Sequence, residues 1–136
     1  MAIAKSLSAK IRRLKKSERA IINLVGDLGS GKTTFIKGFA RGLGIKSKII
    51  SPTFLIIRKL DIRRSKIRKT LYHIDAYRVA PKDIMKIGFD DIINGPDNIV
   101  LIEWGDRLKR ILPKQTIKIS LSYGKKENIR EININI

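Results

Sequence analysis

The chain has 136 residues, of which 43% are hydrophobic, a length that suits one compact domain and is short for two. It has no cysteine and one histidine, which excludes a disulfide framework, a thiol nucleophile, a cysteine-ligated zinc site and a multi-histidine metal site. The 30 Lys and Arg residues outnumber the 12 Asp and Glu residues, leaving a net charge of +18. This charge fits contact with polyanions such as RNA or anionic lipid, and equally a solvated basic surface.

No apolar run approaches the ~20 residues that a membrane-spanning helix needs. The absence of cysteine fits a reducing compartment. We therefore expect a soluble, cytoplasmic protein with a single domain over residues 1–136 and no membrane partner.

The first elements in chain order are a helix, a strand and a second helix. Leu7, Ile11 and Leu14 recur at helical spacing between basic residues, which predicts an amphipathic helix. Ala20–Val25 is a short apolar run typical of a buried strand. Lys32–Leu43 has an apolar helical face and is followed by glycine, a common helix terminator.

The middle of the chain predicts two more strands and a short helix. Phe54–Leu60 and Thr70–Ala76 have strand character, and the basic segment Asp61–Lys69 is interpreted as a connector between them. Asp83–Ile87 predicts a short helix that ends at Gly88.

The last third predicts a buried strand, a helix and a hairpin. Ile99–Glu103 is nearly continuous apolar sequence, as in a strand buried on both faces, and Gly105–Leu112 predicts a helix. Thr116–Ser122 and Ile129–Ile136 alternate apolar and polar residues, which indicates an antiparallel hairpin. The order of elements predicts an α/β fold, a three-layer sandwich with a mostly parallel central sheet and antiparallel C-terminal edge strands.

One motif lies between the first strand and the second helix. Residues 26–33, Gly-Asp-Leu-Gly-Ser-Gly-Lys-Thr, match the phosphate-binding pattern G-x-x-x-x-G-K-[ST] in the strand–loop–helix setting that the pattern requires. We expect Lys32 to face solvent and neutralise phosphate charge, and the Thr33 hydroxyl to bind Mg²⁺. No N-K-x-D sequence is present to read guanine, so ATP is the expected nucleotide. The expected nucleotide contacts are Asp27, Leu28, Gly29, Ser30, Gly31, Lys32, Thr33 and Thr34.

Carboxylates end two of the predicted strands. A P-loop enzyme needs an acid at such a position to hold hydrated magnesium or orient water, and Asp75 and Glu103 are the two candidates; each could also be an ordinary strand-end carboxylate. His73 shares a strand face with Asp75 and is either catalytic or structural. Trp104 could stack on a ligand or partner or plug the core, and Arg78 could bind phosphate or pair with an acid.

Four blocks together resemble the TsaE (YjeE) family. They occur in order as 26–35, Ser51-Pro52-Thr53-Phe54, His73-Ile74-Asp75-Ala76-Tyr77-Arg78, and Ile102-Glu103-Trp104-Gly105-Asp106-Arg107 followed by Leu112-Pro113. The resemblance covers nearly the whole chain from Ile21. The sequence departs from the family pattern before the first helix and in the stretch after Phe54, so the adenine contacts are not assigned.

The resemblance implies the ATPase component of bacterial tRNA threonylcarbamoyladenosine synthesis, acting with the TsaB and TsaD proteins. It implies ATP and Mg²⁺ as cofactors, with Thr33 and Glu103 as magnesium ligands. The resemblance also places Thr53 in a loop that senses the γ-phosphate, and makes it a further magnesium ligand beside Thr33 and Glu103. Asp75 positions or activates water, so the implied catalytic residues are Lys32, Asp75 and Glu103.

Two other functions remain open from the residues alone. A small-molecule P-loop kinase would use the basic connector as a phosphate-clamping lid, made of Arg63, Arg64, Lys66, Arg68 and Lys69. A basic RNA-binding module would keep its RNA affinity without Lys32. In the leading interpretation, tRNA contact is a secondary, sequence-independent contribution of the basic runs Lys10–Arg19 and Arg58–Lys69.

Overall fold

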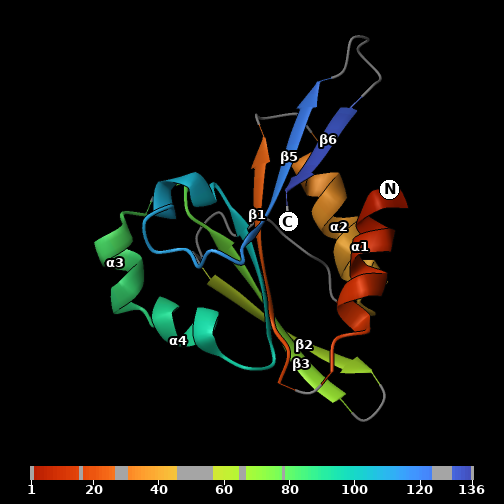
Figure 1. The fold of residues 1–136 in the computed structure, drawn as a ribbon, viewed down its shortest axis with the longest axis horizontal. Coiled ribbons are helices and arrows are strands. Elements are labelled where there is room, and N and C mark those ends of the chain that lie inside the picture. Colours follow the sequence, from red (N-terminus) through yellow and green to blue (C-terminus); the bar gives the residue numbers. More distant parts are fainter. Residues whose placement is uncertain are drawn as a thin grey trace.

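The structure is a computed structural model that describes residues 2–15, 17–26, 31–45, 57–64, 67–77, 79–123 and 130–135. Its centre is a six-stranded sheet in the order β2-β3-β4-β1-β5-β6, and helices lie on both faces of the sheet (Figure 1). The predicted three-layer α/β architecture is therefore confirmed.

The middle of the sheet is parallel. It consists of β3 (Ile67–Asp75), β4 (Asn98–Glu103), β1 (Ala20–Gly26) and β5 (Ile117–Tyr123). Both faces of β1 and β4 are covered, which explains why their sequences are almost continuously apolar. All four strands end at the same edge of the sheet, called here the carboxyl edge; their starting ends form the amino edge (Figure 1).

Antiparallel strands close the sheet on both sides. The expected C-terminal hairpin is present as β5 and β6 (Arg130–Asn135). On the other side, β2 (Ile57–Arg64) pairs antiparallel with β3, from Ile57 opposite Ile74 to Arg64 opposite Ile67. The prediction of a connector over Asp61–Lys69 is therefore wrong, because most of this segment is a β-hairpin that extends beyond the amino edge (Figure 1).

Alternation explains this hairpin better than charge does. Ile62 is buried and Leu60 packs against the core, whereas Asp61 between them is exposed. This is the pattern of an antiparallel strand with one solvated face. The density of basic residues concealed that pattern in the sequence.

In the part of the chain that the structure describes, two α-helices cover each face of the sheet. The helices α1 (Ala2–Arg12) and α2 (Lys32–Gly42) lie on one face, and α3 (Pro81–Lys86) and α4 (Phe89–Asn94) lie on the other (Figure 1). The helices α1 and α2 pack so closely against each other that a Cβ atom at Gly42 would overlap the side chain of Ser8. None of the helices among the described residues is long and apolar enough to cross a bilayer.

Alternate residues of the strands point to opposite faces of the sheet and form two separate hydrophobic cores. The core under α1 and α2 contains mainly Leu7, Ile11, Ile22, Leu24, Phe35, Phe39, Leu71, Ile99, Leu101, Ile119 and Leu121. The core under α3 and α4 contains mainly Ile21, Ile74, Ile84, Phe89, Ile92, Ile93, Val100, Ile102 and Leu108. His73, Asp75 and Glu103 have the strand parity of the first core, so they lie on the same face as α2.

The sequence was less accurate for the helices after β3. The short helix near Asp83–Ile87 is present as α3, but α4 was not predicted. The helix expected over Gly105–Leu112 is only a short 3₁₀ helix, η1 (Gly105–Leu108), followed by further turns with i→i+3 hydrogen bonds. Gly105 is pressed against the buried Asn23 on β1, and a Cβ there would overlap the Asn23 amide.

Candidate functional site

The carboxyl edge gathers the described residues of the predicted site. β1 ends at Gly26, β3 at Asp75 and β4 at Glu103. In the sheet register Asp75 pairs with Glu103, and Leu24 of β1 pairs with Glu103 on its other side. Because neighbouring strands lie roughly 4.8 Å apart, the two carboxylate residues are adjacent on the face that α2 covers. Sequence spacing alone left open which acid lies nearer the first strand; β4, which ends at Glu103, is the neighbour of β1, and β3, which ends at Asp75, lies one strand further away.

The start of α2 has the form expected of a phosphate-binding turn. Gly31 precedes the helix with φ 99°, a left-handed conformation that favours glycine. Thr33 and Thr34 are exposed on the first turn. The first N–H groups of a helix have no intrahelical acceptors, and together with the helix dipole they favour anions. The other predicted contacts, 27–30, lie outside the described residues, as do Thr53 and Arg78.

Lys32 does not face solvent, contrary to expectation. Its residue is 8% exposed, and its Nζ lies 3.9 Å from the ring centroid of Trp104. A cation–π contact of this kind contributes about 1–2 kcal/mol, which a charged ligand can replace. The lysine is thus held beside the carboxyl edge by an aromatic ring.

Trp104 owes its position to an unusual backbone. It follows Glu103 directly and has φ 61°, a left-handed conformation that is uncommon for a large side chain and costs roughly 1–3 kcal/mol. Its ring also contacts that of Tyr77, with centroids 5.0 Å apart and planes inclined by 53°. The half-buried Trp104 packs against the core under α3 and α4 and also contacts Lys32 and Tyr77, so it joins the ends of β3 and β4 to the start of α2.

His73 contacts Glu103 rather than standing free for catalysis. Its Nε2 lies 2.8 Å from Oε2 of Glu103, and both residues are buried. Asp75, by contrast, is half-buried and accepts a hydrogen bond of 3.0 Å from the backbone N–H of Tyr77 through Oδ1. The two acids at the edge are thus oriented by different groups.

The amino edge holds the basic residues proposed for a kinase lid. Arg63, Arg64 and Arg68 belong to the β2–β3 hairpin, and Arg68 lies seven residues before Asp75 on the same strand, or roughly 23 Å at 3.3 Å per residue. The β2–β3 hairpin lies at the opposite end of the sheet from the start of α2 (Figure 1), which contradicts the lid hypothesis. Lys66 lies outside the described residues.

Lys69 is a structural residue. It is 7% exposed, and its Nζ donates to the backbone oxygens of Lys15 and Glu18, at 2.9 and 2.5 Å, and to Oδ1 of Asp97 at 3.1 Å. Asp97 also accepts from the N–H of Ser17 at 2.7 Å. This contact set, called here the Lys69 clip, fastens the segment before β1 to the turn before β4.

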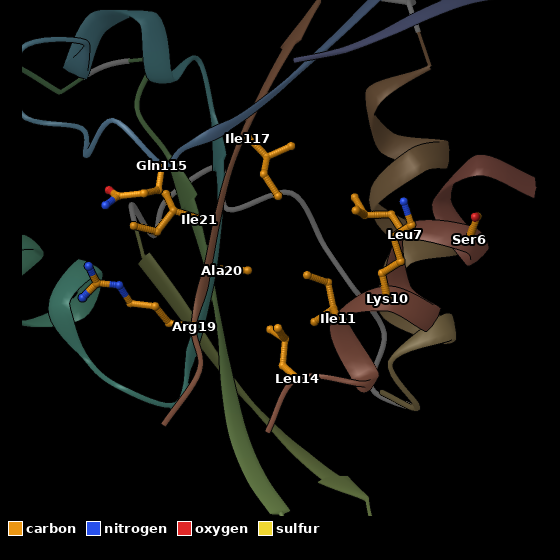
Figure 2. Close-up of a pocket in the computed structure, with 10 residues that line it drawn as sticks. All are labelled: Ser6, Leu7, Lys10, Ile11, Leu14, Arg19, Ala20, Ile21, Gln115 and Ile117. Atoms are coloured by element: carbon orange, nitrogen blue, oxygen red, sulfur yellow. The ribbon is translucent and has the colours of Figure 1, made fainter. Parts of the chain in front are cut away.

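A pocket of about 630 Å³ lies beside α1 and the starts of β1 and β5 (Figure 2). Its lining is mainly apolar and includes Leu7, Ile11, Leu14 and Ile117. Its described lining contains none of Lys32, Asp75 and Glu103.

Comparison with known proteins identifies the family. The sequence model described as "Threonylcarbamoyl adenosine biosynthesis protein TsaE" matches residues 1–132. The chain belongs to the TsaE family. The resemblance recognised in the four sequence blocks is therefore confirmed.

Individual relatives agree with the family match. A tRNA threonylcarbamoyladenosine biosynthesis protein TsaE from Treponema pallidum is 42% identical over 105 residues, which cover 76% of this chain and 73% of the relative. The protein of the same name from Bacillus subtilis is 39% identical over 99 residues, 73% of this chain and 59% of the relative. The crystal structure of Bacillus subtilis YdiB matches with a TM-score of 0.69 and 31% identity, covering 96% of this chain and 76% of that one. The fold is that of a P-loop NTPase.

Proposed function

We propose that this protein binds and hydrolyses ATP with Mg²⁺ as a component of the cytoplasmic machinery that makes threonylcarbamoyladenosine in tRNA, together with the TsaB and TsaD proteins. Membership in the TsaE family supports the pathway. The observation that supports the chemistry is the meeting of Lys32, Asp75 and Glu103 at the carboxyl edge. In open α/β sheets, ligands bind at this edge.

The residues fit a magnesium nucleotide in charge and geometry. Asp75 and Glu103 are register partners on one face, so their carboxylates repel one another unless a cation or proton donor lies between or beside them. Among the described residues no three His, Asp or Glu side chains form a cluster able to cage a metal ion. This suits Mg²⁺, which usually takes one or two protein ligands and completes its shell with phosphate oxygens and water.

We assign the following roles. Asp27, Leu28, Gly29, Ser30 and Gly31 bind the phosphates together with Lys32, Thr33 and Thr34 of the first turn of α2. Thr33, Thr53 and Glu103 hold Mg²⁺. A magnesium ion held there would supply positive charge beside the phosphates. Lys32 leaves the Trp104 ring to reach the phosphates. Asp75, which is oriented by the Tyr77 N–H, positions the attacking water.

The test is ATP hydrolysis by the full chain alone, with the purified TsaB–TsaD pair, and with the pair plus tRNA. We expect the pair to stimulate hydrolysis, and the stimulation to disappear in Lys32→Ala. Equal rates with and without the pair would contradict the proposed function. Phosphate transfer to a small-molecule acceptor in place of water would support a kinase.

A further inference from the structure

His73 is a buried polar side chain to which the function proposed above gives no role. His73 is 1% exposed and lies inside β3, yet its Nε2 contacts Oε2 of Glu103 at 2.8 Å. Glu103 itself is 7% exposed. A histidine that served only to fill space would be replaced in such a core by an apolar residue at lower desolvation cost.

The other ring nitrogen of His73 defines the tautomer. Nδ1 is buried and has no hydrogen-bond partner among the described residues. A proton there would be a buried donor without an acceptor, whereas an unprotonated nitrogen leaves only a lone pair unpaired. The contact with the carboxylate is therefore assigned to a proton on Nε2, which donates the hydrogen bond to Glu103.

The hydrogen bond crosses between strands. In the register of β3 and β4, His73 lies opposite Leu101 while Glu103 lies opposite Asp75. The imidazole thus reaches diagonally toward the carboxyl edge and holds one oxygen of the carboxylate. A carboxylate held through one oxygen cannot rotate freely, and its other oxygen keeps its lone pairs for a ligand.

We propose that His73 is a positioning residue that orients the Glu103 carboxylate for magnesium, an inference that rests on the metal-binding role proposed for Glu103. It also explains why this strand contains a histidine two residues before its terminal acid. Loss of a hydrogen-bonding partner behind a metal ligand typically weakens metal binding by roughly 10- to 100-fold.

The experiment compares three variants by calorimetric titration with ADP at increasing Mg²⁺ and in EDTA. His73→Leu removes the donor, His73→Gln keeps an N–H near the Nε2 position, and Glu103→Gln removes the proposed ligand. We expect His73→Leu to raise the Mg²⁺ concentration for half-maximal effect by about 10-fold or more, with ADP affinity in EDTA within about twofold of the parent. His73→Gln should restore most of the Mg²⁺ response.

The outcomes separate this inference from the proposed function. A parental Mg²⁺ response in Glu103→Gln overturns the metal role of Glu103 and the positioning role with it. A shifted response in Glu103→Gln with a parental one in His73→Leu overturns the positioning role alone. If His73→Leu fails to fold, His73→Gln decides: a shift as large as that of Glu103→Gln contradicts positioning by the Nε2 donor, and a near-parental response supports it.

Discussion

The two edges of the parallel strands each hold a buried lysine, and the two lysines have different surroundings. At the amino edge, the ammonium of Lys69 donates to three oxygens, two of them from the backbone. At the carboxyl edge, Lys32 lies over the ring of Trp104 at the start of α2. A lysine has three N–H donors, so the Lys69 clip uses its full capacity within the fold.

The comparison shows how to separate structural from functional charge in a protein this basic. Lys69 joins segments that are far apart in sequence, and a ligand that took its donors would break the three hydrogen bonds that hold them together. Lys32 contacts an aromatic ring at the end of the sheet where two strands end in acids. Position relative to the strand ends, rather than charge density, distinguishes the two.

The largest expected effect is on hydrolysis at the carboxyl edge. Asp75→Asn should lower the partner-stimulated rate at least about 100-fold, because orienting water matters mainly in the transition state. ATP affinity should stay close to the parental value, since the asparagine oxygen can still accept from Tyr77. Single-turnover hydrolysis measures the rate, with the exposed Asp83→Asn as the matched control. A parental rate would assign water positioning to another residue.

The next effect is on nucleotide binding. Lys32→Ala should weaken ATP–Mg²⁺ binding about 10- to 100-fold, the loss expected for hydrogen bonds between a charged donor and phosphate. Calorimetric titration measures the affinity. Lys59→Ala, an exposed lysine of β2, is the control and should bind normally. Unchanged affinity in Lys32→Ala would remove the P-loop assignment.

At the amino edge the expected loss is in stability. Lys69→Met should lower the free energy of unfolding by about 2 kcal/mol. This loss is smaller than that from breaking a fully buried ion pair, because the Asp97 side chain is 31% exposed. Denaturant unfolding measures this loss, and Lys59→Met should change stability by no more than about 0.5 kcal/mol. ATP affinity of folded Lys69→Met should be parental. A nucleotide-binding defect without loss of stability would contradict the structural role assigned to Lys69 at the amino edge.

The smallest effect concerns four basic residues of the β2–β3 hairpin. Replacement of Lys59, Arg63, Arg64 and Arg68 by glutamine should weaken tRNA association of the assembled complex and reduce its salt dependence by roughly 0.9 logarithmic units per lost phosphate contact. ATP affinity should not change, because the hairpin lies at the far edge. Filter binding at several salt concentrations tests this. Unchanged tRNA affinity would mean that the hairpin is only a solvated surface.

Much of the carboxyl edge was predictable from the sequence. The phosphate-binding pattern follows an apolar strand, and Asp75 and Glu103 each end another. Carboxyl ends of parallel strands meet at one edge, so three separate patterns converge once the sheet is parallel. The contact of His73 with Glu103 was not predictable, because it depends on β3 and β4 being neighbours in one particular register.

Other features depend on geometry that a single sequence does not express. The left-handed backbone of Trp104 brings its ring to Lys32. No residue type at this position indicates such a conformation in advance. The six residues of α4 are too few for a clear helical period. In β2, basic side chains concealed the alternation of Leu60 and Ile62. The high charge of this segment predicts a connector, whereas the structure has a strand there.

Trp104 is the only tryptophan in the chain, and it lies between Lys32 and Tyr77 in the proposed site. The fluorescence of an indole responds to nearby charge and to aromatic neighbours. Departure of the Lys32 ammonium from the Trp104 ring therefore changes the fluorescence of the protein. No other indole contributes to that signal. The protein thus carries its own optical probe, and stopped-flow emission from unlabelled protein times the release of Lys32 from Trp104.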